Sequence, residues 1–221
     1  MEVKEAVRKR RSIRAFESKP VSKNVLKGIM EHSLWAPSWG NTQSWGFTIV
    51  SGNPLDLIKK ESLQLFQQGV EPNPEIIMPS QWDEIQTARY QSVAKGMFDT
   101  LDIKRDEKEK RNYFYQQGMS FFGAPHMIYL HLHKGFNQYA LLDGGLILQT
   151  IALLAVEEGL GTCFMAMAVT YPEVVRKHTR LSPDRTLVVG LAIGYPVSNH
   201  PLNLFRSQRG NPEEFIQWVE K

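Results

Sequence analysis

The chain has 221 residues and a mass of 25.3 kDa, with 42% hydrophobic and 22% charged residues. This composition excludes a disordered, collagen-like or low-complexity chain, and the length suits one large domain or two small ones. The 26 lysines and arginines exceed the 23 acidic residues by only three, a small surplus for a protein that binds nucleic acid over its whole length.

Cysteine usage and the N-terminal residues indicate the compartment. Cys163 is the only cysteine, so the chain forms no internal disulfide and no zinc site built from several cysteines. The first residues lack the apolar run of a secretory signal, and the most apolar stretch, residues 140–169, is interrupted by charges and glycines. These features predict a soluble, cytoplasmic protein.

Helix signals dominate the first third of the chain. Ser22 is a good N-cap, with Val21 and Leu26 placed as a hydrophobic staple, and this helix is expected to stop at Ala36 because Pro37 follows. Residues 46–52 predict a short strand between glycines. Pro54 then starts a helix that should run to about Gln68.

The middle of the chain alternates polar and apolar elements. Residues 69–79 are rich in proline and irregular, and residues 81–122 predict two polar helices with ion pairs Asp106/Lys110 and Glu107/Arg111. Residues 126–133 predict a strand. Residues 139–156 are apolar nearly all round, which is typical of a buried helix, and Gly144 and Gly145 within it suggest that another backbone packs closely.

Two more strands, at residues 162–169 and 186–195, and a short last helix at 213–219 complete the prediction. The fold class is therefore α+β, with about four short strands separated by helices. No repeat or linker divides the chain, so residues 1–221 are expected to form a single domain with a helical excursion at about residues 69–117.

Several common sites are absent from the sequence. Phe164 stands where a dinucleotide fingerprint needs glycine, and there is no phosphate loop of the P-loop type and no nucleophile elbow. His131 and His133 share one face of a predicted strand but lack a third metal ligand, which favours a structural role. Cys163 lies in an apolar strand, where a thiol is more often structural than reactive.

The strongest positive signal is the basic run at residues 8–14. Five cations in seven residues, with the hydroxyl of Ser12 among them, suit a phosphate held by charge-assisted hydrogen bonds. A solvated basic helix end and a nucleic-acid patch explain the same residues, since cations are favoured at helix C-termini. Composition alone leaves these alternatives open.

A set of motifs in order along the chain resembles the FMN-dependent nitroreductase family. They are RRSIRAF (residues 10–16), APSWGNTQSW (36–45), Asp143 in the apolar helix, GLGT (159–162), GYP (194–196) and RSQR (206–209). The polar excursion that ends at Pro125 is similar to the branch with nitrobenzene and nitrobenzoate reductases, of the oxygen-insensitive NAD(P)H type. The resemblance implies a nitroreductase-like fold, with a central mostly antiparallel sheet flanked by helices.

The resemblance also implies which residues bind FMN. It places Arg10, Ser12 and Arg209 at the phosphate and ribityl end, with Arg11 in the same motif and Arg206 as a further candidate. Other members often carry a basic residue where this chain has Ser207. The remaining implied contacts are Arg14 at the flavin N1/O2 edge, Met165, Ala166 and Met167 along the backbone facing N5, and a loop that reaches the partner subunit's FMN through Pro37, Ser38, Trp39 and Asn41.

The implied activity is ping-pong transfer of hydride from NADH or NADPH to a nitroaromatic or quinone-like acceptor. A fixed cation such as Arg14 favours the negative charge that reduction leaves at N1–C2=O, and no protein acid or base is required. Tyr90 and Phe98 in the excursion are predicted to contact the aromatic substrate. The alternatives are a reductive dehalogenase-like flavoprotein of the same fold and a nucleic-acid-binding protein that is not an enzyme.

The expected assembly is a homodimer with FMN at the subunit interface. The helix at residues 139–156 is too apolar to leave exposed, and the loop at residues 37–43 resembles one that contributes to a partner's flavin site. Neither a metal, a membrane nor a nucleic acid is expected as a partner. The sequence does not distinguish NADH from NADPH.

Overall fold

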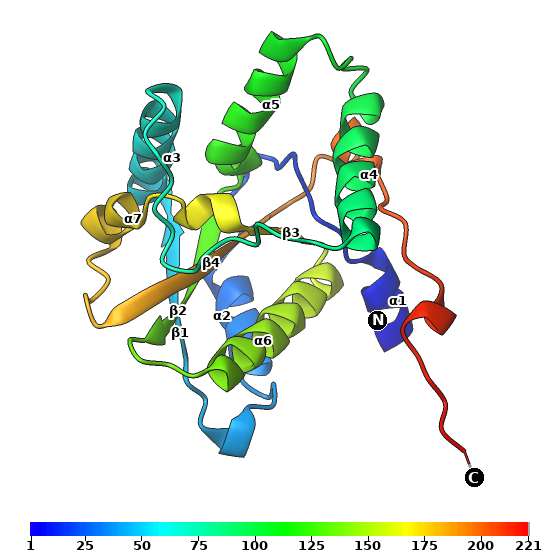
Figure 1. The fold of residues 1–221 in the computed structure, drawn as a ribbon. Coiled ribbons are helices and arrows are strands. Elements are labelled where there is room, and N and C mark those ends of the chain that lie inside the picture. Colours follow the sequence, from blue (N-terminus) through cyan, green and yellow to red (C-terminus); the bar gives the residue numbers. More distant parts are fainter. Residues whose placement is uncertain (221) are drawn as a thin grey trace.

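The computed structural model describes residues 1–220 and contains a four-stranded sheet. The strands are β1 (Trp45–Ser51), β2 (His126–His133), β3 (Gly161–Met165) and β4 (Arg185–Gly194), in the spatial order β1-β2-β4-β3. All three neighbouring pairs are antiparallel. The prediction of a mostly antiparallel sheet with flanking helices is confirmed, and Figure 1 shows the helices around it.

Helices separate the strands along the chain. The α-helices are α1 (Val3–Lys9), α2 (Lys23–Ser33), α3 (Gly52–Gln67), α4 (Glu84–Thr100), α5 (Lys108–Met119), α6 (Gln138–Glu157), α7 (Pro172–Thr179) and α8 (Pro201–Leu204). Short 3₁₀ helices form at η1 (Trp39–Asn41), η2 (Phe121–Gly123), η3 (Ala166–Val169) and η4 (Pro212–Glu214).

Helix α2 begins as the sequence predicts and ends early. The Ser22 hydroxyl accepts a hydrogen bond from the Val25 N–H at 3.3 Å, and Val21 and Leu26 are both buried in one apolar cluster. The helix ends at Ser33 rather than Ala36. Ser33 donates its hydroxyl proton to the Met30 carbonyl at 2.7 Å, and hydroxyl-to-carbonyl bonds of this kind compete with the helical ladder.

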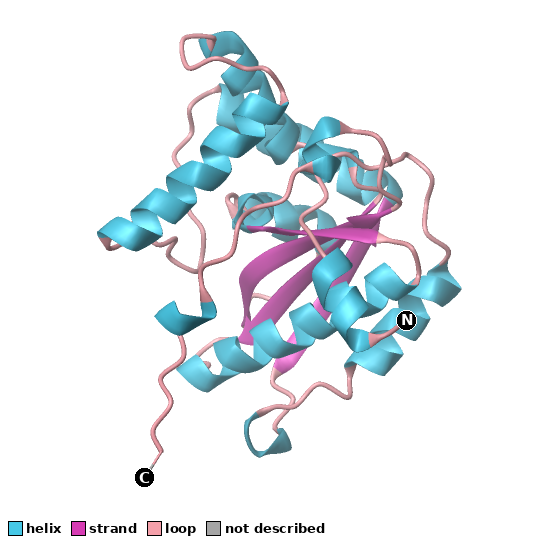
Figure 2. Ribbon diagram, turned by 90° about the vertical axis from the view of Figure 1, so that its right-hand side faces the viewer, coloured by secondary structure: helices cyan, strands magenta, loops and turns pink. Residues whose placement is uncertain are grey.

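Central strand β2 is buried on both faces because the sheet carries helices on both sides, as Figure 2 shows. Met127 and Tyr129 pack into a cluster with α3 and α7, whereas Ile128 and Leu130 pack into a cluster with α2 and α6. Side chains of a strand alternate between the two faces. The fold is therefore three layers, and β2 forms the centre of both cores.

Helix α6 is long and apolar enough to span a membrane by length and composition, yet it packs as a core helix. Eight of its residues are buried. A Cβ built on Gly144 would lie 2.8 Å from Leu130 Cδ2, whereas one on Gly145 would meet nothing within 4 Å. The prediction that another backbone packs closely here is therefore wrong: the close contact at Gly144 is with the Leu130 side chain of β2.

The excursion contains the two predicted helices, α4 and α5, which rise from the sheet at the top of Figure 1. Phe98, Phe114 and Leu202 form a small core beneath them. Neither predicted ion pair, Asp106/Lys110 or Glu107/Arg111, forms among residues 1–220. Glu107 instead pairs with Lys110 at 2.5 Å, and the Arg111 guanidinium lies 3.9 Å from the Phe98 ring centroid. A cation over an aromatic face replaces the ion pair.

Two predictions in the C-terminal half of the chain need correction, and one helix there was missed. Strand β3 ends at Met165, and residues 166–169 form η3 instead of extending the strand. Helix α7 was not predicted, although Pro172 stands at its first position. The last helix is only the single turn η4, and residues 215–220 continue without helix.

Candidate functional site

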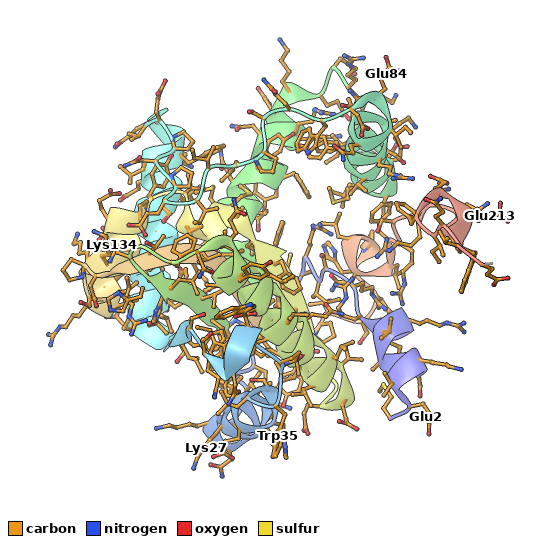
Figure 3. All side chains as sticks on the ribbon, turned by 60° about the horizontal axis from the view of Figure 1, so that its bottom comes forward. Glu2, Lys27, Trp35, Glu84, Lys134 and Glu213 are labelled. Atoms are coloured by element: carbon orange, nitrogen blue, oxygen red, sulfur yellow. The ribbon has the colours of Figure 1, made fainter. Side chains whose placement is uncertain are left out.

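A cavity of about 480 Å³ lies between the end of α1 and the C-terminal segment, and we call it the arginine pocket. Figure 3 shows the two elements on the same side of the molecule, marked by Glu2 and Glu213. The residues that line the arginine pocket are Val7, Arg8, Arg10, Arg11, Ser12, Arg14, Val93, Phe205, Arg206, Ser207 and Arg209. Five of the predicted FMN contacts therefore meet in one place with Arg206.

The first wall of the pocket is fixed by pairing with β3. Ile13 N–H donates to the Thr162 carbonyl at 2.9 Å, and Ser12 forms a parallel bridge with Thr162. Ile13 is buried in the core. Neighbouring residues of an extended segment point to opposite sides, so burial of Ile13 turns Ser12 and Arg14 toward the pocket.

The second wall is the segment after α8, and its two arginines do different things. Arg206 donates to the carbonyls of Arg8 and Lys9, both at 3.3 Å, and so satisfies the last carbonyls of α1. Arg209 donates to the Ser207 hydroxyl at 2.7 Å and to the Ser207 carbonyl at 3.0 Å. Arg206 therefore ties the two walls together, whereas Arg209 bonds, within the described part of the chain, only to its own turn.

The pocket concentrates positive charge without an acidic partner. Among residues 1–220 none of its six arginines forms an ion pair, and no acidic side chain lines it. Burial, and then the guanidinium groups of Arg209 and Arg206, lower the pKa of Arg10. Burial and Arg206 lower the pKa of Arg11, whose buried Nε has no hydrogen-bond partner.

Such an arrangement is complementary to a phosphate. Like charges repel each other and a buried donor without an acceptor costs free energy, and an anion with several acceptor oxygens relieves both. The fork-shaped guanidinium groups match phosphate geometry. The residues present therefore fit the phosphate of FMN.

A second cavity of about 750 Å³ adjoins the first, and Arg14 lines both. We call it the aromatic cavity. It is lined by Arg14, Ala15, Phe16, Leu101, Ile103, Glu109, Lys110, Tyr113, Phe114, Gln117, Phe122, Gly123, His200 and Leu202. Flat apolar walls beside a cation suit an aromatic ring that carries polar or negative atoms at one edge.

The turn at η2 gives the aromatic cavity a strained wall. Phe121, Phe122 and Gly123 have φ values of 55°, 52° and 77°, and bulky residues rarely adopt this left-handed conformation. Phe121 is fully buried, and the Phe122 carbonyl accepts from the Phe16 N–H at 3.3 Å. Strain of this kind persists where the surrounding structure imposes it, often at binding sites.

The remaining predicted FMN contacts lie outside these two cavities. Met165 is buried, Ala166 is exposed, and Met167 packs against Gly118 of α5. The loop with Pro37, Ser38, Trp39 and Asn41 is largely exposed, and it is anchored by the Trp39 N–H, which donates to Asp143 Oδ1 at 3.0 Å. It borders a separate cavity of about 330 Å³ that shares no lining residue with the arginine pocket.

The two predicted substrate contacts are placed differently. Tyr90 is exposed and stacks on Trp82 with ring centroids 4.8 Å apart. Phe98 is only 4% exposed and packs edge-on against Phe114 at 5.2 Å. Neither lines the arginine pocket or the aromatic cavity. Phe98 therefore holds α4 and α5 together.

Sequence reasoning missed the α5 residues that line the aromatic cavity. Tyr113 and Gln117 are four residues apart, and Phe122 follows in η2. Their spacing places Tyr113 and Gln117 on one helix face. That spacing was the sequence signal that could have identified these two residues as part of a site. The many charged residues around them instead suggested a solvent-exposed helix.

The histidines and the cysteine have structural surroundings. His131 is buried and lies 3.2 Å from the Thr48 hydroxyl, and His133 pairs with Asp184 at 3.1 Å. Within residues 1–220 no group of three metal-ligating side chains exists. Burial raises the pKa of the Cys163 thiol, which opposes formation of a reactive thiolate.

Comparisons with known proteins identify the family of the chain. The family model described as the nitroreductase family matches residues 7–195. The chain is 26% identical to a nitrobenzene nitroreductase of Ectopseudomonas oleovorans over 221 residues, covering 99% of this chain and 97% of the relative. It is 26% identical over 205 residues to a 4-nitrobenzoate reductase of Nocardioides sp., covering 89% of this chain and 81% of that protein.

Solved structures extend the likeness. The FMN and NADPH-dependent nitroreductase NfnB of Sphingopyxis sp. strain HMH has a TM-score of 0.95 and 33% identity, with all of both chains covered. NfnB of Mycobacterium smegmatis, solved in complex with NADPH, has a TM-score of 0.92 over 99% of this chain and 100% of that one. At 22% identity the second likeness concerns the fold alone.

Proposed function

The chain belongs to the nitroreductase family, and from this premise we propose that it is an FMN-dependent oxidoreductase that reduces nitroaromatic or quinone-like acceptors with NADH or NADPH. The observation that carries the proposal is the arginine pocket, a cluster of six guanidinium groups without an acidic partner among the described residues. The relatives that share its fold and a third of its residues are FMN and NADPH-dependent nitroreductases. A cytoplasmic location is part of the proposal.

The residues of the arginine pocket would hold the cofactor by its phosphate. Arg10, Arg11 and Ser12 would donate from the first wall and Arg209 from the second, where its guanidinium is bound only to its own turn. Arg206 would keep the walls together through the carbonyls of α1. FMN, when bound, supplies a ring that accepts hydride from the nicotinamide and passes it to the acceptor.

Arg14 would serve the ring end of the cofactor. It lines both the arginine pocket and the aromatic cavity, so its charge would stabilise negative charge on the ring of a bound flavin. The aromatic cavity would receive the nicotinamide and then the acceptor between apolar walls. No side chain is assigned a proton-transfer role.

The proposal is tested on the purified full-length protein. We expect a yellow protein with a flavin absorbance band, oxidation of NADH or NADPH, and initial-rate patterns with parallel lines when both substrates are varied. A colourless protein that takes up no FMN would refute the proposal. A protein that binds FMN but reduces only halogenated aromatics would support the dehalogenase alternative. Tight binding of nucleic acid that FMN does not displace would support the other alternative, a nucleic-acid-binding protein that is not an enzyme.

The assembly we propose is a two-fold homodimer in which each subunit completes the other's site. Tyr139, Leu142 and Leu146 are large apolar residues exposed at 56%, 58% and 39% on α6, and Gly145 beside them leaves open space. Trp39, 61% exposed, lies with its ring centroid 6.1 Å from that of Tyr139. The apolar face and the loop at residues 37–41 are thus adjacent, which supports a partner that covers both.

Replacing Leu142 with glutamate should therefore convert the dimer into a monomer at micromolar concentration and reduce FMN occupancy. A carboxylate at the centre of an apolar interface is desolvated without a partner. Light scattering and the flavin absorbance of the purified protein measure the two effects. The control is Lys60→Glu on the exposed side of α3. An L142E protein that stays dimeric and fully loaded would show that this face is not the interface.

Tyr90 remains our candidate for acceptor contact on α4, since its ring is exposed whereas that of Phe98 is buried. Because Tyr90 does not line the aromatic cavity, the contact we propose is with the part of an acceptor that extends out of that cavity. Replacing Tyr90 with alanine should change the relative kcat/KM among nitroaromatic acceptors severalfold while FMN affinity stays constant, because no pocket residue is altered. The control is Ile85→Ala, an exposed apolar residue of the same helix. Identical acceptor profiles for Y90A and the unmodified protein would exclude this contact.

A further inference from the structure

The Asn203 side chain is the most completely hydrogen-bonded polar group near the proposed site. Asn203 lies in α8 and is 1% exposed. Its Oδ1 accepts from the Arg14 N–H at 2.8 Å, and its Nδ2 donates to the carbonyls of Ala15 at 2.8 Å and Val197 at 3.0 Å. All three bonds reach main-chain atoms, and two of the three join the segment that carries Arg14.

The segment at residues 14–17 needs this side chain because its own pairing is incomplete. Glu17 N–H donates to the Tyr195 carbonyl at 2.9 Å, Val197 N–H donates to the Ala15 carbonyl at 3.0 Å, and Phe16 forms an isolated bridge with Pro196. This short ladder leaves the Arg14 N–H without a main-chain partner. The amide of Asn203 extends the ladder by one rung, as a peptide group would.

Only an amide of this length meets the requirement. The position needs one acceptor and two donor hydrogens at once, which asparagine provides. Alanine would leave the Arg14 N–H unpaired, and buried unpaired groups are costly. An aspartate would direct an oxygen toward two carbonyl oxygens. The bonds therefore fix the main chain of Arg14 rather than merely filling space.

The Arg14 guanidinium, in contrast, is held weakly by the protein. Its one side-chain hydrogen bond goes from Nη1 to the Ser12 carbonyl at 3.4 Å, and the side chain lines both cavities. The region that this guanidinium can reach therefore depends on where the main chain places the Arg14 Cα. A group that fixes this main chain controls where the charge lies.

We infer that Asn203 is a positioning residue that holds the Arg14 guanidinium at the ring edge of the bound flavin and thereby favours the reduced form of the cofactor. The inference rests on the proposed function. The negative charge that reduction adds is stabilised by a nearby fixed cation, so displacement of Arg14 weakens binding of reduced FMN more than binding of oxidised FMN.

The test compares Asn203→Ala, Arg14→Gln and the double variant in the FMN-loaded protein. The readouts are the FMN dissociation constant from fluorescence titration and the midpoint potential of bound FMN against reference dyes. We expect R14Q to lower the ratio of reduced to oxidised binding about 10-fold, which corresponds to about 30 mV for a two-electron couple. N203A should lower the same ratio about 3- to 10-fold. The double variant should have the same ratio as R14Q, because both changes act through one guanidinium.

The control is Ser22→Ala, which also removes a side-chain bond to the main chain but at the start of α2; its midpoint potential should equal that of the unmodified protein. If N203A does not fold, Asn203→Ser, which keeps a small polar side chain at the position, serves for the same comparison. An unchanged midpoint potential in the folded Asn203 variant would overturn the inference and leave the proposed function standing. Shifts in midpoint potential that add in the double variant would do the same. Failure of the unmodified protein to bind FMN would refute the proposed function and this inference with it.

Discussion

Replacing Arg209 with alanine should weaken FMN binding about 10- to 100-fold. A hydrogen bond to a charged group contributes about 1.5–3 kcal/mol, and each 1.4 kcal/mol is about tenfold in affinity. Among residues 1–220 Arg209 bonds only within its own turn, to Ser207 and Gln208. Its removal therefore leaves no buried partner unpaired, so the free protein should fold normally and fluorescence titration should report the loss of the phosphate contact alone.

Arg206 provides an informative contrast to Arg209. It satisfies carbonyls at the end of α1, so Arg206→Ala should lower the melting temperature of the free protein, whereas Arg209→Ala should not. The control for charge alone is Arg180→Ala, at the exposed end of α7. Unchanged FMN affinity in R209A would show that the phosphate lies elsewhere. Equal losses of FMN affinity in R209A and R180A would mean that the effect comes from the change in net charge alone.

Local signals predicted the elements whose cause is local. Ser22 starts α2 because its hydroxyl caps the helix. Residues 126–133 form β2 because a short, mostly apolar run suits a strand that is covered on both faces. The apolar run after Cys163 shows the limit of such signals. It suits a strand or a buried turn equally, and packing against β4 and α5 decides that the strand stops at Met165.

The candidate site was predictable only in part, because its walls are distant in sequence. The motif at residues 10–14 has the charges and the hydroxyl of a phosphate site. Its partner at Arg209 could be assigned only by resemblance to a family, since no spacing rule joins residues almost two hundred apart. Asn203 gave no signal, because a single asparagine in a four-residue helix looks like any turn residue. Its role exists only in the folded structure.

Replacing Gly161 with alanine should damage both the fold and the cofactor site. A Cβ built there would lie 2.3 Å from Ile13 Cγ1 and 3.0 Å from Ile13 Cβ. Ile13 is 3% exposed and its N–H is bonded to the Thr162 carbonyl, so it has little room to move. Overpacking of this kind costs about 1–3 kcal/mol, and at roughly 2–4 °C per kcal/mol for a chain of this length the melting temperature should fall by about 2–12 °C.

The same change should weaken FMN binding, because Ile13 holds Ser12 and Arg14 at the pocket and any shift of the segment moves both. The matched control is Gly28→Ala in α2, where a new Cβ meets nothing within 4 Å and the loss of a helical glycine should stabilise by up to about 1 kcal/mol. Adding Ile13→Ala to Gly161→Ala removes Cγ1, the closest clashing atom, and leaves the 3.0 Å contact with Cβ. The double variant should regain part of the FMN affinity, although the lost side-chain carbons keep stability low. Thermal melting and FMN titration of the four proteins separate these effects. Wild-type affinity in G161A would mean that the pairing of residues 12–13 with β3 does not position the arginines, and the pocket would then have to be held by the C-terminal segment alone.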